Sequence, residues 1–195
     1  MTVGVSRMNR STGRFIPGFD AVLAAAKQGD GRAFEQLYAA FCGPVAGFVR
    51  SRGMHDPDGI VNEAFLGAFT GLATFTGDEA GFEAWLFRIT RNKLADELRR
   101  RSREPATYDQ NIAADLAGGD VEADALAALG DEWVQRRLDA LTPDQRDVLL
   151  LRVVADLPVD QTAEVLGKRP GAIKALQRRA LRRLNRELRT EGVSK

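Results

Sequence analysis

The sequence predicts an all-α protein made of two small helical domains that a flexible acidic linker joins. Apolar residues recur three or four positions apart through most of the chain, which is the spacing of an amphipathic helix. No stretch of useful length alternates apolar and polar residues, as a half-buried strand would. The helical spacing stops over residues 105–129, where alanine, glycine and aspartate dominate. The 195 residues, 44% of them apolar, suit one domain or two small ones with a real core.

The first domain is predicted over residues 20–104, after a disordered lead-in over residues 1–19 that shows no period. An alanine-rich helix begins at Asp20 and stops at Gly29. Asp30 can cap a second helix, whose apolar residues form one buried face. The residues of that face are Phe34, Leu37, Tyr38, Phe41, Val45 and Phe48.

Two more helices complete the first domain. Helical spacing resumes at Asp58, after a loop marked by Asp56-Pro57, and continues to Ala68. A loop over residues 74–81, rich in glycine, then precedes a long helix from about Phe82 to Arg103. This helix ends before a proline, which cannot continue it.

The second domain is predicted over residues 130–190, followed by a short tail over residues 191–195. Helices return at Trp133. The segment Thr142-Pro143-Asp144-Gln145 is a strong helix start, because threonine can cap, proline suits the first position and glutamine can complete a capping box.

A helix-turn-helix is predicted within this second domain. A short helix over about residues 159–166 stops at Gly167, and another helix starts near Pro170. The second of these helices carries one apolar stripe, formed by Ile173, Leu176, Ala180, Leu184 and Leu188. Off the stripe lie Lys174, Gln177, Arg178, Arg182 and Arg186. Arginine and glutamine on the free face of such a helix can read bases in the DNA major groove, and the other cations can bind phosphate.

Charge lies in blocks, although the net charge is only +1. Residues 86–103 hold seven bases and two acids, and residues 168–189 hold nine bases and one acid. Between them, residues 104–135 hold eight acids and no base. Clustered positive charge is typical of a protein that binds a polyanion. Basic surface helices without a nucleic-acid partner are the simpler alternative.

The first basic block suits single-stranded nucleic acid. The helix that contains it has a polar face formed by Arg88, Asn92, Asp96, Arg99 and Arg103. Phe75, Phe82 and Trp85 flank the glycine loop before it. Aromatic rings beside a basic helix can stack on unpaired bases. Core packing is the alternative for these rings, and we prefer it for Trp85.

Several protein classes are excluded or disfavoured. No run approaches the roughly 20 apolar residues of a membrane span, and the first twenty residues show no secretory signal, so we expect a cytoplasmic protein. The single cysteine, Cys42, and the single histidine, His55, exclude an intramolecular disulfide and a Cys/His zinc site. No phosphate-binding glycine loop, nucleophile elbow or acid/base set is present, so we expect no enzymatic activity, no cofactor and no metal.

Two parts of the chain resemble the conserved regions of extracytoplasmic-function (ECF) sigma factors. The first part resembles region 2 and contains Asn62-Glu63-Ala64-Phe65, Phe82-Glu83-Ala84-Trp85-Leu86-Phe87-Arg88 and Asp96-Glu97-Leu98-Arg99-Arg100. The second part resembles region 4 and contains Leu141-Thr142-Pro143-Asp144-Gln145-Arg146 and Gly171-Ala172-Ile173-Lys174-Ala175-Leu176-Gln177-Arg178. The resemblance covers about residues 21–103 and 130–189.

The resemblance implies a promoter-specificity subunit of bacterial RNA polymerase that makes and breaks no bond itself. Region 2 would dock on the clamp helices of the largest polymerase subunit and hold the melted −10 element. Region 4 would read the duplex −35 element near the flap of the second-largest subunit, and the acidic linker would enter the polymerase channel. An anti-sigma factor is a further partner that the family allows.

The same resemblance implies three sets of contact residues. Core polymerase would bind Asp58, Asn62, Glu63, Phe65 and Leu66. The −10 strand would contact Phe75, Gly77, Asp78, Phe82, Arg88, Arg91, Asn92, Asp96, Arg99 and Arg100. The −35 duplex would contact Arg169, Gly171, Lys174, Ala175, Gln177, Arg178, Arg179 and Arg182.

The chain departs from the family pattern at a few positions. Gly59 and Asn62 stand where an acid and a glutamine are common, which indicates altered polymerase docking. Lys168-Arg169-Pro170 and Ala175 replace small or hydroxylated residues, which indicates a distinct −35 sequence.

A stand-alone helix-turn-helix repressor or activator is the alternative function. Such a protein would bind duplex DNA without polymerase, typically as a dimer on a palindrome. The sequence does not identify the promoter bases, the regulon or the inducing signal. It also leaves open how the two domains are arranged in the free protein.

Overall fold

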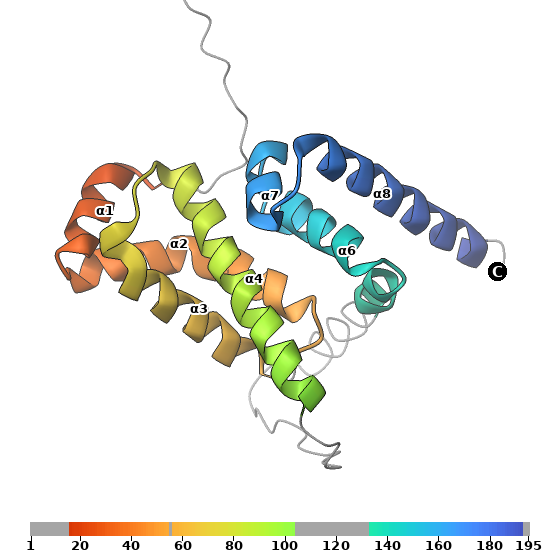
Figure 1. Ribbon diagram of the computed structural model, residues 1–195, viewed down its shortest axis with the longest axis horizontal. Helices are drawn as coiled ribbons and strands as arrows, with labels where there is room; N and C mark the ends of the chain where they lie inside the picture. The colour runs from red at the N-terminus through yellow and green to blue at the C-terminus, as the bar shows by residue number, and fades with distance from the viewer. Residues whose placement is uncertain (1–15, 55, 104–132, 193–195) are drawn as a thin grey trace, which may run out of the picture.

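The computed structural model describes residues 16–54, 56–103 and 133–192, and these ranges contain helices but no strand. The helices form two groups that lie against each other (Figure 1). Helices α1 to α4 make the first group, and a helix over residues 133–139 with α6, α7 and α8 makes the second. The predicted all-α, two-domain fold class is confirmed. The predicted linker over 105–129 and most of the predicted lead-in lie outside the described residues.

The first domain is a four-helix unit. Its helices are α1 (Phe19–Lys27), α2 (Gly31–Arg50), α3 (Pro57–Gly71) and α4 (Glu79–Arg103), with a single 3₁₀ turn over Leu72–Thr74. The predicted Asp30 cap is present, since its carboxylate accepts the backbone N–H groups of Arg32 at 2.8 Å and Ala33 at 3.3 Å. Asp56 caps α3 in the same way, accepting the N–H of Gly59 at 2.8 Å.

Two boundaries of this domain differ from the prediction. The lead-in was expected to reach residue 19, but Ile16 is buried and its N–H donates to Oε1 of Glu79 at 2.8 Å, so the ordered part begins at least that early. Helix α4 starts at Glu79 rather than near Phe82, because Asp78 caps it by accepting the N–H of Gly81 at 2.8 Å. Residues 79–81 of the predicted glycine loop therefore belong to the first turn of a helix.

The second domain contains α6 (Pro143–Leu149), a π-helical stretch (Leu150–Val154), α7 (Val159–Leu166) and α8 (Pro170–Gly192). The predicted capping box of α6 is present: the N–H of Gln145 donates to Oγ1 of Thr142 at 3.4 Å, and the N–H of Thr142 donates to Oε1 of Gln145 at 3.2 Å. Gly167 has φ +61° between α7 and α8, a backbone that favours glycine and makes the tight turn of the helix-turn-helix. Helix α8 extends to Gly192, beyond the predicted domain end at residue 190.

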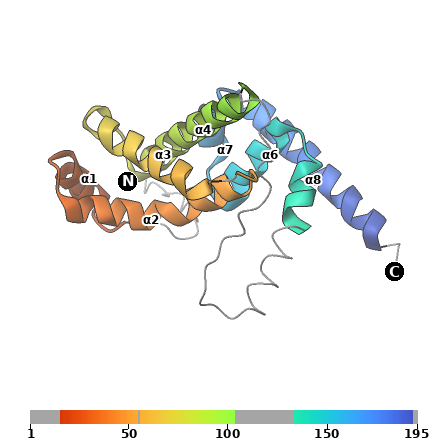
Figure 2. The same ribbon diagram turned by 90° about the horizontal axis from the view of Figure 1, so that it is seen from below.

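One buried core runs through both domains. In the first domain it is rich in phenylalanine, with the rings of Phe48 and Phe87 packed edge to face at a centroid distance of 5.5 Å. In the second it is aliphatic, with Leu151, Leu157 and Ile173 fully buried. The domains touch where α4 packs against α7 and where α2 meets the π-helical stretch (Figure 2). The arrangement of the domains, which the sequence left open, is therefore closed.

Candidate nucleic-acid and protein interfaces

Helix α8 presents a row of cations to solvent. Its buried side is anchored by Ile173 and Ala180, which face the core of the second domain. On the opposite side Lys174, Arg178 and Arg182 follow one another at four-residue steps, and all three are exposed. No ion pair neutralises these three within the part of the chain that the structure describes. A helix with one face docked and a free cationic face has the geometry needed to enter a DNA groove.

The other residues expected to contact the −35 duplex surround that row. Arg169 and Gly171 are exposed at the N-terminal end of α8, and Arg179 is exposed one helical position after Arg178. Ala175 and Gln177 are half-buried on the flank. An ion pair between Lys168 Nζ and Asp144 Oδ2 at 2.9 Å joins the turn before α8 to α6. This contact helps to fix the position of the N-terminal end of α8, and with it the row of cations, relative to α6.

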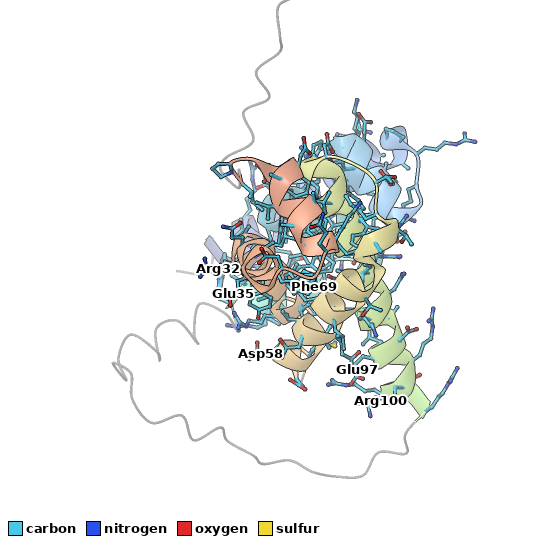
Figure 3. All side chains as sticks on the ribbon, turned by 90° about the vertical axis from the view of Figure 1, so that its left-hand side faces the viewer. Arg32, Glu35, Asp58, Phe69, Glu97 and Arg100 are labelled. Atoms are coloured by element: carbon cyan, nitrogen blue, oxygen red, sulfur yellow. The ribbon has the colours of Figure 1, made fainter. Side chains whose placement is uncertain are left out.

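Helix α4 carries the second basic surface, but part of its charge is already paired. Arg88 and Asn92 are exposed without a charged partner among the described residues, whereas Arg99 pairs with Asp96 at 2.7 Å. Arg100 and Arg101 both donate to Glu97, and these hydrogen bonds lower the pKa of Glu97 to about 2 (Figure 3).

Arg91 points away from the exposed face of α4. Its Nε lies 3.3 Å from Oδ2 of Asp147, which belongs to the second domain. Of the residues expected to contact the −10 strand, Arg91 is therefore engaged between the domains in this arrangement.

The aromatic residues beside α4 form core rather than a surface for bases. Phe82 has no exposed surface and lies between the rings of Phe41, at 5.3 Å, and Phe75, at 5.5 Å. Phe75 is also buried, and its carbonyl accepts Lys27 Nζ at 2.6 Å. In this arrangement other rings cover both Phe75 and Phe82, so neither offers a ring face to a base, and their contact with the −10 strand stays a prediction. Trp85 is half-buried and packs at 5.0 Å on Phe75, in line with the preference for core.

The short connection before α4 leaves polar groups in the open. Gly77 and Asp78 are exposed, and one carboxylate oxygen of Asp78 caps α4 by accepting the N–H of Gly81. This connection and the exposed polar side of α4 are the parts of the first domain that can reach a nucleic-acid strand.

The outer side of α3 combines acids with an apolar tip. Leu66 is 68% exposed, and Asn62 and Glu63 are exposed beside it. Asp58 is exposed at the start of the helix and pairs with Arg50 at 3.2 Å (Figure 3). Phe65, expected to bind a partner, is instead buried, with its ring 4.6 Å from that of Tyr38. A mixed face of this kind is typical of a protein–protein interface.

Tyr38 was missed as a candidate contact residue. The helical spacing placed it on the buried face of α2, but the structure leaves 37% of it exposed over Phe65. Its hydrogen bond with Cys42, followed by partial burial, raises the pKa of its hydroxyl. No pattern in the sequence distinguishes a ring at the edge of a helical stripe from one at its centre.

An apolar groove opens between the domains. It has a volume of about 840 Å³ and is lined by the end of α2, the helix over 133–139, the π-helical stretch and α8. Val153 and Val134 are the most exposed apolar residues on its wall. Among the described residues no group of histidine, cysteine, aspartate or glutamate could hold a metal, and no helix is long and apolar enough to cross a membrane.

Comparison with known proteins identifies both domains. The family model described as Sigma-70 region 2 matches residues 37–104, and the one described as Sigma-70, region 4 matches residues 131–184. The ECF RNA polymerase sigma factor SigD of Mycobacterium tuberculosis is 31% identical over 187 residues, which cover 89% of this chain and 85% of SigD. The ECF RNA polymerase sigma factor BldN of Streptomyces coelicolor is 34% identical over 84% of this chain, and the match spans 63% of BldN.

Solved structures agree with these matches. CnrH, in complex with the cytosolic domain of CnrY, superimposes with a TM-score of 0.68 at 28% identity, over 87% of this chain and 96% of CnrH. The sigma factor RpoE of Bartonella quintana, in complex with the anti-sigma factor NepR, shares the fold with a TM-score of 0.61 at 23% identity, over 80% of this chain and 96% of RpoE. With both conserved regions present in the order of these relatives, the chain belongs to the family of ECF RNA polymerase sigma factors.

Proposed function

We propose that this chain binds core RNA polymerase, recognises the −10 and −35 promoter elements and directs the initiation of transcription. The observation that carries the proposal is the row formed by Lys174, Arg178 and Arg182, three exposed cations that no acid of the described residues neutralises. Such a row, on a helix-turn-helix in a sigma-family chain, is what binding to duplex promoter DNA requires.

In the second domain, α8 enters the major groove of the −35 element. Lys174 and Arg178 lie close to its N-terminal end, where a recognition helix meets base edges. Arg182 lies one turn further along and contacts phosphate, which fixes the register of the helix on the duplex. Gln177, half-buried beside the row, can bind an adenine edge.

In the first domain, the exposed side of α4 and the connection before it hold the melted −10 strand. Arg88 and Asn92 supply a cation and an amide without partners among the described charged groups, and Gly77 allows close approach of the strand. Unstacking a base costs a few kcal/mol, which contacts to the strand must offset. Because Phe75 and Phe82 are covered, polar contacts carry this task.

The face of α3 docks on polymerase. Leu66 and Tyr38 supply apolar area. The exposed carboxylates of Asp58 and Glu63, which pair with Arg50 and Lys93 in the free chain, can exchange these partners for basic groups of polymerase. We assign this face to the clamp helices of the largest subunit and the second domain to the flap of the second-largest subunit. CnrH has been solved in complex with the cytosolic domain of CnrY, and we include a protein partner that binds this chain as an anti-sigma factor in the proposal.

The test is co-purification with bacterial core polymerase, followed by run-off transcription from a promoter library. Stable association and promoter-dependent transcripts are expected, and the transcripts would define both promoter elements. The double variant K174A/R178A should lose at least about tenfold in transcription from these promoters while still binding polymerase. The control R32A/R136A removes two exposed arginines elsewhere and should behave like wild type.

Two outcomes would overturn the proposal. Tight duplex binding by the chain alone, without any polymerase association, would identify a stand-alone repressor or activator. Equal loss of polymerase binding and of transcription in K174A/R178A would reject the assignment of α8 to DNA.

A further inference from the structure

A buried carboxylate joins the two domains. Asp147 on α6 is 6% exposed and accepts Nη2 of Arg52 and, at 3.3 Å, Nε of Arg91. Arg52 follows the C-terminal end of α2 and Arg91 lies in the middle of α4. Both cations therefore come from the first domain and the acid comes from the second.

These charges are paired only while the domains are docked. The side chain of Arg52 is 13% exposed, and its guanidinium also lies 5.0 Å above the ring of Phe48. Exposed ion pairs contribute little to stability, but removing one partner of a buried pair leaves an uncompensated charge away from water. The three side chains thus favour this one docking of the domains over other arrangements.

Close packing surrounds the ionic contact. Helix α4 lies along α7, which Figures 1 and 2 both show. At Gly47 of α2 an added Cβ would lie 3.1 Å from Cγ1 of Val154 in the π-helical stretch. The absence of a side chain at Gly47 is what lets the two segments approach this closely.

A docked pair of domains is too short to contact both promoter elements. The names −10 and −35 place the elements about 25 base pairs apart, which is about 85 Å along the duplex at 3.4 Å per step. A compact body of about 150 residues has a radius of gyration near 15 Å and is therefore about 40 Å across. Even α8, at 1.5 Å per residue, is only about 35 Å long. The domains must separate before α4 and α8 can bind their elements together.

We propose that Asp147, held between Arg52 and Arg91, is a latch that keeps the free chain closed and inactive until polymerase and promoter separate the domains. This inference rests on the proposed function for its consequence in transcription, but closure itself is a property of the free chain. The latch also withholds Arg91 from the exposed side of α4, so closure and binding of the −10 strand compete for the same guanidinium.

The first experiment measures closure in the free chain. Spin labels are attached at E35C and N185C, two exposed positions on α2 and α8, in a C42S background, and the distance distribution between them is recorded. We expect a single narrow distance distribution for the parent chain, because one docked arrangement fixes the separation of the two labels. D147N keeps the shape but removes the charge, and should lower the ratio of closed to open molecules by at least about tenfold.

The matched control is D139N. Asp139 lies in the same domain and pairs with Arg146 at 2.8 Å, but on the surface, so its distance distribution should equal that of the parent. Circular dichroism of each variant checks that helix content is unchanged. A D147N distribution that matches D139N, with full helix content, would overturn the latch.

The second experiment locks the chain closed. In the C42S background, G47C and V154C place two thiols where a disulfide fits, because the 3.1 Å between the added Cβ and Val154 Cγ1 is close to the distance from Cβ to the partner sulfur, about 3 Å. The oxidised chain should support at least tenfold less promoter-dependent transcription than the same chain after reduction. Equal activity in both states would overturn the inactivity of the closed form. If the reduced G47C/V154C chain and the wild-type chain both failed to bind polymerase, the proposed function would be wrong. The distance measurements on the free chain would still decide whether the latch exists.

Discussion

Replacing Phe82 by alanine is expected to destabilise the first domain rather than to remove a contact with DNA. The ring has no exposed surface, and four other rings surround it at centroid distances of 5.3 to 5.9 Å. Truncating a buried phenylalanine costs about 3–5 kcal/mol, and lost ring–ring contacts place this site at the upper end, about 5 kcal/mol. At about 2–4 °C per kcal/mol for a chain of this length, the melting temperature should fall by about 10–20 °C.

Urea unfolding of the free chain, followed by circular dichroism, measures this change. L66A is the matched control, because it removes a similar apolar side chain that is mostly exposed, and it should shift stability by less than about 0.5 kcal/mol. F82L keeps most of the buried volume and should lose less than F82A, while retaining promoter melting in the complete transcription assay.

Two results would refute the reasoning on Phe82. An F82A variant within about 1 kcal/mol of wild type would show that the ring is not a core element. An F82L variant that is stable but cannot melt the promoter would show that the ring leaves the core to bind a base.

Three further predictions follow from the surfaces described. L66D should weaken polymerase binding at least tenfold by titration, because it puts a charge into the apolar tip of α3, whereas the control L98D on α4 should bind normally; equal effects would contradict the docking assignment. In salt titrations of promoter binding by the holoenzyme, R182A should reduce the slope of log affinity against log salt concentration by about 1, and an unchanged slope would show that Arg182 does not contact phosphate. Glu97 should titrate by NMR near its lowered pKa of about 2, so its ion pairs should hold above pH 4.5 and be lost as the pH falls through 2; titration near 4.5 would mean that Arg100 and Arg101 do not bind it in solution.

The features that the sequence predicted well are those that local rules determine. Asp30, Thr142 and Gly167 act within a few residues of their own position, as two caps and a turn, and all three do so in the structure. The apolar stripe of α8 likewise needs only helical spacing, and its members Ile173 and Ala180 are fully buried. Its last predicted member, Leu188, is 44% exposed, so the stripe is buried only over the earlier turns of the helix. The exposed cations of α8 follow directly, because they are what the stripe leaves on the opposite side.

The features that the sequence could not predict depend on partners far away in the chain. Periodicity shows that Phe65, Phe75 and Phe82 are apolar, but it cannot tell a ring covered by another helix from one kept free for a ligand. Asp147 stands directly before the apolar run Val148–Leu151, where local rules suggest only an acid in the first turns of a helix. Its partners Arg52 and Arg91 lie 95 and 56 positions earlier, so only the docked domains reveal what the carboxylate binds.

The position of Arg91 connects closure to promoter binding by thermodynamic linkage. A guanidinium that binds Asp147 in the closed chain and a DNA strand in the open one cannot do both, so each binding event weakens the other by the same factor. Loss of the carboxylate in D147N therefore removes a competitor of the −10 strand as well as a bond between domains. The variant should bind a single-stranded −10 oligonucleotide more tightly than D139N does, even without polymerase, because its Arg91 is free before the strand arrives. Equal affinity of the two variants would mean that Arg91 serves only the contact between domains, and that the −10 strand is held by Arg88, Asn92 and their neighbours alone.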